Sequence, residues 1–275
     1  MQQELIYDTV NIPQGQIGYA KFGNGHPLVM ITRYAATLYN WDSSLILELA
    51  RYFTLYLLDS REVGLSQSSN SNDINGYTAD IAQAIDALGL DKPIILGWSF
   101  GGVAVQQLYK QYGHNISGLV LLSSFPDPRM ASQDFIDLSM GIGKALTDGD
   151  KLYLYQLMLS ETPNAKHPNR MKHSVISIKD YHYRYTDKAK KLHNQFVQTS
   201  PASTIEELAA INVPALILNA KNDRSFPADG REILSNHIPN SKLIVYPTGG
   251  HLLIHHHGSE IASDIATFFI RSQLC

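Results

Sequence analysis

Short, continuous apolar runs alternate with amphipathic helical segments along this chain, and this alternation constrains its fold more than any other feature. The apolar runs lie at residues 27–31, 53–58, 93–96, 118–122, 214–218 and 243–246. Such runs are typical of strands that are buried on both faces of a sheet. Between them, residues 79–88, 103–112 and 261–270 have helical spacing, and Gly89 stands where the first helix would end. This order predicts a mainly parallel sheet with helices on both faces.

The two remaining regions complete the predicted architecture. Residues 4–22, turned at Pro13-Gln14-Gly15, predict an antiparallel hairpin at one edge of the sheet. Residues 126–211 contain no convincing strand, but 150–159 and 187–197 have helical patterns. A structureless loop of that length is improbable in a compact domain, so we expect a helical cap inserted into one core domain. The core would comprise residues 1–125 and 212–275, and the cap residues 126–211.

Charge and cysteine content exclude several classes of function. Lys plus Arg number 22 and Asp plus Glu number 25, a net charge of −3 that leaves no basic footprint for nucleic acid. The single cysteine is Cys275, and no dinucleotide or phosphate-loop motif occurs, so we expect no cofactor and no metal. No apolar stretch is long enough to span a membrane and no leader pattern is visible at residues 1–5. We therefore expect a cytoplasmic monomer or homodimer.

The chemistry is indicated by a glycine-rich turn after the apolar run 93–96. The turn reads Gly97-Trp98-Ser99-Phe100-Gly101-Gly102 and leads into a helical segment. Glycines on both sides allow a sharp turn that presents the serine oxygen above a helix N-terminus, whose dipole favours a developing anion. We therefore predict that Ser99 is a nucleophile.

A nucleophilic serine needs a base, and the base needs an orienting carboxylate. Asp223 follows the apolar run 214–218, and His251 follows the run 243–246. Because the carboxyl ends of parallel strands meet at one edge of the sheet, all three residues are expected there. Asp127, which follows the run 118–122, is an alternative acid, and we rank Asp223 ahead of it.

In these features the chain resembles the α/β-hydrolase superfamily, in the branch with a helical cap after the sixth strand. The stretch from Asp59 to Ser66 is similar to the family's D-x-R-G-x-G-x-S loop. The resemblance implies an eight-stranded sheet in which Ser99 is the nucleophile, Asp223 the acid and His251 the base. It also implies an oxyanion hole formed by the backbone N–H groups of Phe100 and Tyr34.

The sequence departs from the family in two loops. Thr32-Arg33-Tyr34 replaces the usual His-Gly, so we expect backbone strain at Arg33, where glycine is preferred. Either this loop is repacked and still forms the same hole, or Arg33 pairs with a substrate carboxylate; we favour the first. Glu62 replaces a glycine of the second loop, which puts that loop's geometry in question.

Together these features predict a serine hydrolase that acts on a small or medium acyl substrate, most simply a carboxylic ester. Trp98 and Phe100 flank the nucleophile and favour an apolar acyl site, with Arg33 and Trp98 as candidate substrate-binding residues. A cofactor-free haloperoxidase, a C–C bond hydrolase, acyl transfer to an alcohol and a non-hydrolytic small-ligand binding protein stay open. His251 and the run 255–257 contain H-x-x-x-H, but no further ligand cluster accompanies it.

Overall fold

The computed structural model describes residues 6–34, 36–137, 158 and 186–272. One sheet runs through these residues in the order β1-β2-β4-β3-β6-β7-β8-β9, with a further short strand, β5, on β2. The strands are β1 (Ile6–Ile12), β2 (Gly15–Gly23), β3 (His26–Ile31), β4 (Phe53–Leu58), β5 (Gln67–Ser68), β6 (Ile94–Trp98), β7 (Gly118–Leu122), β8 (Ala215–Ala220) and β9 (Ser241–Tyr246).

The direction of the strands matches the prediction. From β4 to β9 every neighbouring pair is parallel, whereas β1 and β2 form an antiparallel hairpin in which Ile12 pairs with Gly15. The predicted hairpin and the six predicted strands are thus all present, and eight strands form the continuous order. The predicted burial on both faces is wrong for β9, which lies at the edge of the sheet and exposes Val245. Strand β5 was not predicted, because two residues carry no hydrophobic pattern.

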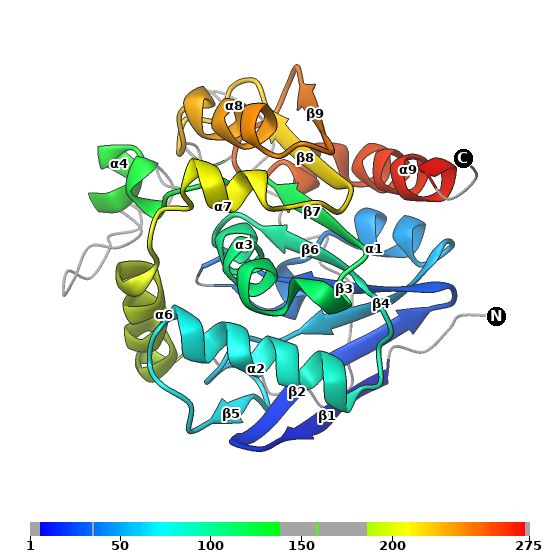
Figure 1. The fold of residues 1–275 in the computed structure, drawn as a ribbon, viewed down its shortest axis with the longest axis vertical. Coiled ribbons are helices and arrows are strands. Elements are labelled where there is room, and N and C mark those ends of the chain that lie inside the picture. Colours follow the sequence, from blue (N-terminus) through cyan, green and yellow to red (C-terminus); the bar gives the residue numbers. More distant parts are fainter. Residues whose placement is uncertain (1–5, 35, 138–157, 159–185, 273–275) are drawn as a thin grey trace, which may run out of the picture.

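Helices cover both faces of the sheet (Figure 1). Helices α1 and α9 pack against each other on one face, and α2 and α3 pack together on the other. The α-helices are α1 (Ser43–Leu49), α2 (Ile74–Ala87), α3 (Phe100–Tyr112), α4 (Gln133–Phe135), α6 (Asp187–Thr199), α7 (Ile205–Ala209), α8 (Ala228–His237) and α9 (Ile254–Ser272). Short 3-10 helices occupy Leu38–Asn40, Gly113–Asn115 and Pro128–Met130. Gly89 follows α2 with φ +64°, the left-handed conformation predicted for a helix end.

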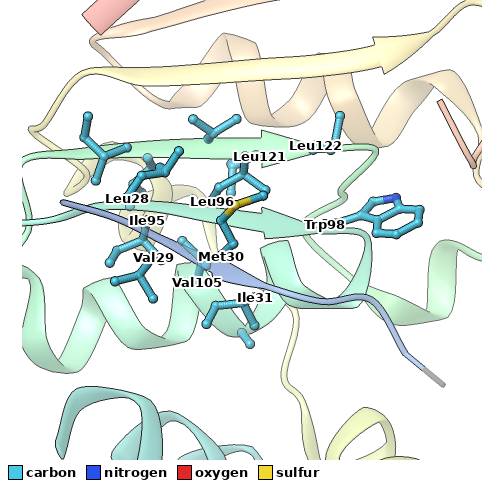
Figure 2. Packing of buried hydrophobic residues seen from close by; sticks show 14 of the residues in the cluster. Leu28, Val29, Met30, Ile31, Ile95, Leu96, Trp98, Val105, Leu121 and Leu122 are labelled. Carbon is cyan, nitrogen blue, oxygen red and sulfur yellow. The ribbon is translucent and has the colours of Figure 1, made fainter. Parts of the chain in front are cut away.

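The core is densest around the three central strands. Figure 2 shows apolar side chains of β3, β6 and β7 packed together with Val105 of α3. Leu28, Leu96 and Leu121 are fully buried there. Truncating such a leucine to alanine typically costs about 2–5 kcal/mol of stability. This rigid centre supports the strand ends from which the candidate site is built.

Between β7 and β8, the described residues contain helices and no strand. The predicted helix at 187–197 is observed as α6, which lies beside α2 (Figure 1). The helical pattern at 150–159 lies almost wholly outside the described residues. The division into a core and a cap at residues 126–211 therefore stays a prediction. In the described part of the chain, no helix combines the length and apolar character that a membrane crossing requires.

Candidate active site

Ser99 occupies a strained turn between β6 and α3. Its backbone has φ 55° and ψ −119°, and its N–H donates to the carbonyl of Leu122 on β7 at 2.8 Å. A non-glycine residue in such a conformation costs about 1–3 kcal/mol. The turn is also too tight for a side chain at Gly97, where an added Cβ would lie 2.4 Å from the carbonyl oxygen of Gly101. These two glycines allow the sharp turn that presents Ser99 beyond the strand end.

Three side chains from different strand ends form a hydrogen-bonded chain. Ser99 Oγ lies 2.7 Å from His251 Nε2, and His251 Nδ1 lies 2.8 Å from Asp223 Oδ2. With the Nδ1 proton donated to the carboxylate, Nε2 is left to accept the hydroxyl proton of Ser99. The structure therefore brings together the three residues that were predicted to act together.

The carboxylate of Asp223 is held by its own loop. Its Oδ1 accepts from the backbone N–H groups of Ser225 at 2.8 Å and Phe226 at 3.1 Å, which leaves Oδ2 for the imidazole. The alternative acid, Asp127, is engaged elsewhere: its Oδ1 accepts from the N–H and the Nε of Arg129. Of the two candidate acids, the structure places Asp223 against His251.

An apolar pocket opens at Ser99. Among the described residues, its polar side chains are Ser99 and Tyr34; the others are apolar, namely Phe100, Phe125, Pro128, Ala131, Phe135, Val197 and Phe226. The ring of Phe226 stacks on His251 at 5.0 Å and on Phe125 at 3.6 Å. Aromatic walls of this kind exclude water and suit an apolar acyl group.

The two residues predicted for the oxyanion hole both line this pocket. Phe100 is the first residue of α3, so its N–H lies at the positive end of the helix dipole. The loop after β3, which carries Tyr34, touches the turn directly, because an added Cβ at Gly101 would lie 2.5 Å from the carbonyl oxygen of Ile31. The loop lacking the usual His-Gly therefore still lies beside Ser99.

The phenol of Tyr34 is held by a residue that sequence reasoning missed. Tyr34 Oη donates to Asn194 Oδ1 on α6 at 2.5 Å, and burial raises the pKa of Tyr34 to about 12. The phenol is therefore neutral at ordinary pH. The helical pattern at 187–197 placed Asn194 on a helix, but no sequence signal linked it to a loop 160 positions away.

Arg33 and Trp98, the predicted substrate-binding residues, contact each other instead of lining the pocket. Trp98 is fully buried at the end of β6 (Figure 2), with its ring 5.4 Å from that of Trp41. The guanidinium carbon of Arg33 lies 5.2 Å from the Trp98 ring centre, and its NH1 donates to the carbonyl of Tyr34 at 2.9 Å. In the described structure, the guanidinium therefore faces the protein rather than the pocket.

The backbone strain predicted for Arg33 is not found. Arg33 is not among the described non-glycine residues with positive φ, so the loop turns without left-handed backbone at that position. The other departure does carry strain: Glu62, at the position of a family glycine, has φ +64°. Its side chain forms an ion pair with Lys188 of α6 at 2.9 Å.

The histidines near the site have separate partners. His255 Nδ1 lies 3.3 Å from Asp42 Oδ2, whereas His257 Nε2 lies 2.9 Å from Thr248 Oγ1. A search of the described residues finds no group of three His, Cys, Asp or Glu side chains that could hold a metal ion.

Comparison with known proteins identifies the family. A model of the alpha/beta hydrolase fold matches residues 26–257. The chain is 23% identical over 262 residues to a non-heme haloperoxidase of Rhodococcus erythropolis, covering 92% of this chain and 95% of that protein. It is also 23% identical over 237 residues to a pimeloyl-[acyl-carrier protein] methyl ester esterase of Nitrosomonas europaea, covering 83% and 90%. An alpha/beta hydrolase fold protein from Chitinophaga pinensis superposes with a TM-score of 0.78 at 19% identity over 98% of each chain.

Proposed function

Because the chain belongs to the alpha/beta hydrolase fold family, we propose that it is a serine hydrolase that cleaves carboxylic esters with small or medium, apolar acyl groups. The observation that carries this proposal is the continuous hydrogen-bonded chain from Ser99 through His251 to Asp223. Such a chain allows a serine to act as a nucleophile at neutral pH.

The geometry supports a two-step mechanism. His251 Nε2 takes the proton of Ser99 as Oγ attacks the ester carbonyl carbon, and Asp223 stabilises the resulting imidazolium. The tetrahedral oxyanion is held by the N–H groups of Phe100 and Tyr34, and loss of one such donor typically costs about 10²–10³ in rate. His251 then protonates the leaving alkoxide. Water, deprotonated by the same imidazole, attacks the acyl-enzyme and releases the carboxylic acid and free Ser99.

The pocket supports the choice of an apolar acyl group. Apart from Ser99 and Tyr34, its described lining consists of aromatic and aliphatic side chains, with no charged group among them. A carboxylate or ammonium placed there would lose hydration without gaining a partner of opposite charge. A similar relative is named for methyl ester hydrolysis, which agrees with an ester substrate.

A second candidate, non-heme haloperoxidase activity, is favoured by the similarity to the Rhodococcus erythropolis protein of that name. It would depend on the same nucleophile. Peroxide-dependent bromination of a dye distinguishes ester hydrolysis from haloperoxidase activity. Haloperoxidase activity requires that the wild type brominates the dye and that Ser99→Ala does not. If the wild type hydrolyses esters but brominates no dye, the proposed ester hydrolase activity stands alone.

The test of the proposed function is the intact mass of the protein after exposure to a fluorophosphonate. An activated serine displaces fluoride from phosphorus, so we expect one adduct on the wild type and none on Ser99→Ala. Ser259→Ala is the matched control, since this exposed serine lies on α9 outside the pocket, and it should be labelled like the wild type. An unlabelled wild type would contradict the proposal and favour a small-ligand binding protein on the same scaffold.

A further inference from the structure

Arg33 contacts both parts of the candidate active site that must keep a fixed relative position. Its NH1 donates to the backbone carbonyl of Tyr34, and its guanidinium lies over the ring of Trp98, the residue immediately before Ser99. Building on the proposed function, we infer that Arg33 is a positioning residue that holds the loop with the second oxyanion donor against the turn with the nucleophile.

The first step of the argument is that the two segments touch. An added Cβ at Gly101 would lie 2.5 Å from the carbonyl oxygen of Ile31 and 2.6 Å from that of Thr32. The backbone after β3 therefore rests on the turn that carries Ser99. A small shift of this loop would move the N–H of Tyr34 relative to the oxyanion, and such errors in position are costly in rate.

The second step is that Trp98 is a rigid platform. It is fully buried, packs against Trp41, and directs its indole Nε1 towards the carbonyl of His251 at 3.5 Å. Trp98 is thus joined to the nucleophile through the backbone and contacts the base through its side chain. A cation over the face of a tryptophan ring is an attractive arrangement, and arginine is the residue most often found in it.

The third step concerns the peptide that Arg33 bonds. The N–H and carbonyl of Tyr34 belong to adjacent peptide planes, so holding the carbonyl limits the rotation of the residue whose N–H is needed. Arg33 stands where the family resemblance leads us to expect a glycine, whose flexibility would allow the turn. Here the loop turns without left-handed backbone at Arg33, and its side chain supplies contacts that glycine lacks.

The competing explanation is that Arg33 binds a substrate carboxylate. In the described structure its guanidinium faces the backbone of Tyr34 and the ring of Trp98, and Arg33 does not line the pocket at Ser99. The two explanations differ in what removal of the charge does. A positioning residue affects every ester, whereas a carboxylate-binding residue affects only esters that carry a carboxylate.

The experiment compares Arg33→Gln and Arg33→Lys with the wild type. We measure the second-order rate of fluorophosphonate labelling, and kcat and KM for p-nitrophenyl butyrate and for a p-nitrophenyl monoester of a dicarboxylic acid. We expect Arg33→Gln to slow labelling and to lower kcat about 10–100-fold for both esters, with KM changed less than about threefold, since complete loss of an oxyanion donor costs about 10²–10³. Arg33→Lys keeps the charge over Trp98 and should recover part of the rate.

The matched control is Arg51→Gln. Arg51 also lies over an aromatic ring, that of Tyr52 at 5.8 Å, but it is exposed and is not among the described residues that line the pocket. Labelling of Arg51→Gln should therefore proceed at the wild-type rate. Wild-type labelling rates for folded Arg33→Gln would overturn the inference, as would a rise in KM confined to the carboxylate ester. If Arg33→Gln does not fold, the labelling rate of Arg33→Lys is used instead. Labelling slower than that of the wild type supports the inference, and wild-type labelling overturns it. An unlabelled wild type would instead refute the proposed function, so the two failures are distinguishable.

Discussion

Tyr34 and Asn194 are joined by a hydrogen bond of 2.5 Å between the phenol and the amide oxygen, which links the loop after β3 to α6. Val197, one turn further along α6, lines the pocket together with Tyr34. The ring of Tyr34 also makes an edge contact with His193 at 6.4 Å. Helix α6 therefore contributes Val197 to the pocket wall and contacts the predicted oxyanion loop through Asn194 and His193.

The first prediction concerns this hydrogen bond. Tyr34→Phe and Asn194→Ala should each lower the free energy of unfolding by about 0.5–1.5 kcal/mol, the usual net contribution of one hydrogen bond. The double variant should lose less than the sum, because both single changes remove the same bond. Urea unfolding of the four proteins measures this coupling. Strict additivity of the two losses would contradict the contact.

The second prediction separates the two candidate acids. Asp223→Asn keeps the size of the side chain but removes the charge that stabilises the imidazolium and selects its tautomer. We expect ester hydrolysis to fall by about 10⁴, as in other serine hydrolases that lose the triad carboxylate. Asp127→Asn is the matched control and should retain activity near the wild type, since Asp127 bonds to Arg129. A large loss in Asp127→Asn with little loss in Asp223→Asn would reverse the assignment.

Sequence reasoning succeeded where local patterns determine the structure. Parallel strands in this sheet are short continuous apolar runs, so all six were predicted, and the glycines around Ser99 indicated the tight turn that the structure has. Only the burial of β9 was predicted wrongly, because an apolar run does not show whether its strand lies at an edge. The chain order predicted that Ser99, Asp223 and His251 meet at one edge of the sheet, and in the structure hydrogen bonds join these three residues. These features depend on residues close in sequence, or on the common direction of parallel strands.

The failures depended on contacts between distant segments. Asn194, the hydrogen-bond partner of Tyr34, lies on α6, and the guanidinium of Arg33 lies over the ring of Trp98, 65 positions further along the sequence. Neither contact leaves a periodic signal. Strain was predicted at Arg33 by analogy with glycine, but of the two departing loops it is the one with Glu62 that has a positive φ at the departing residue.

The third prediction is a pH dependence of stability that originates at His193. This residue of α6 is buried, its Nε2 contacts the carbonyl of Arg61 at 3.3 Å, and burial lowers the pKa of His193 to about 4. In the unfolded chain the pKa is about 6.5, so between these values the unfolded state binds a proton that the folded state does not. Stability contributed by neutral His193 is therefore present above pH 6.5 and is lost as the pH falls towards 4.

This contribution amounts to about 3 kcal/mol, because each pKa unit corresponds to about 1.4 kcal/mol. His193→Gln keeps a donor for the carbonyl of Arg61 but cannot titrate. In urea titrations the wild type should lose about 3 kcal/mol of unfolding free energy relative to His193→Gln as the pH falls from 7 to 4. The exposed His114→Gln is the control and should leave the pH profile unchanged. A pH-independent difference for His193→Gln would refute the prediction.

The fourth prediction concerns the size of the acyl group. Phe135 lines the pocket and makes an edge contact with His251 at 5.7 Å, whereas Phe226 stacks directly on His251. Phe135→Ala should therefore enlarge the pocket with less disturbance of the base. We expect the ratio of kcat/KM for octanoate over butyrate p-nitrophenyl esters to rise about tenfold or more, since each added methylene in an apolar site gains about 1 kcal/mol or more. An unchanged ratio would mean that the acyl group lies elsewhere.

The fifth prediction addresses the strain at Glu62. A non-glycine residue in the left-handed region costs about 1–2 kcal/mol, whereas glycine costs about 0.5–1 kcal/mol in chain entropy. Glu62→Gly removes the strain together with the ion pair to Lys188, and Lys188→Gln removes the ion pair alone. Because such pairs contribute about 0–1 kcal/mol, the comparison isolates the backbone effect.

Glu62→Gly should therefore unfold at a higher urea concentration than Lys188→Gln, with a free energy of unfolding larger by up to about 1 kcal/mol. Fluorophosphonate labelling of Ser99 should proceed at the wild-type rate in both variants, since neither residue lines the pocket in the described structure. A lower stability of Glu62→Gly than of Lys188→Gln would show that the side chain of Glu62 contributes more than its ion pair. In that case the left-handed backbone at this position is compensated by contacts that glycine cannot make.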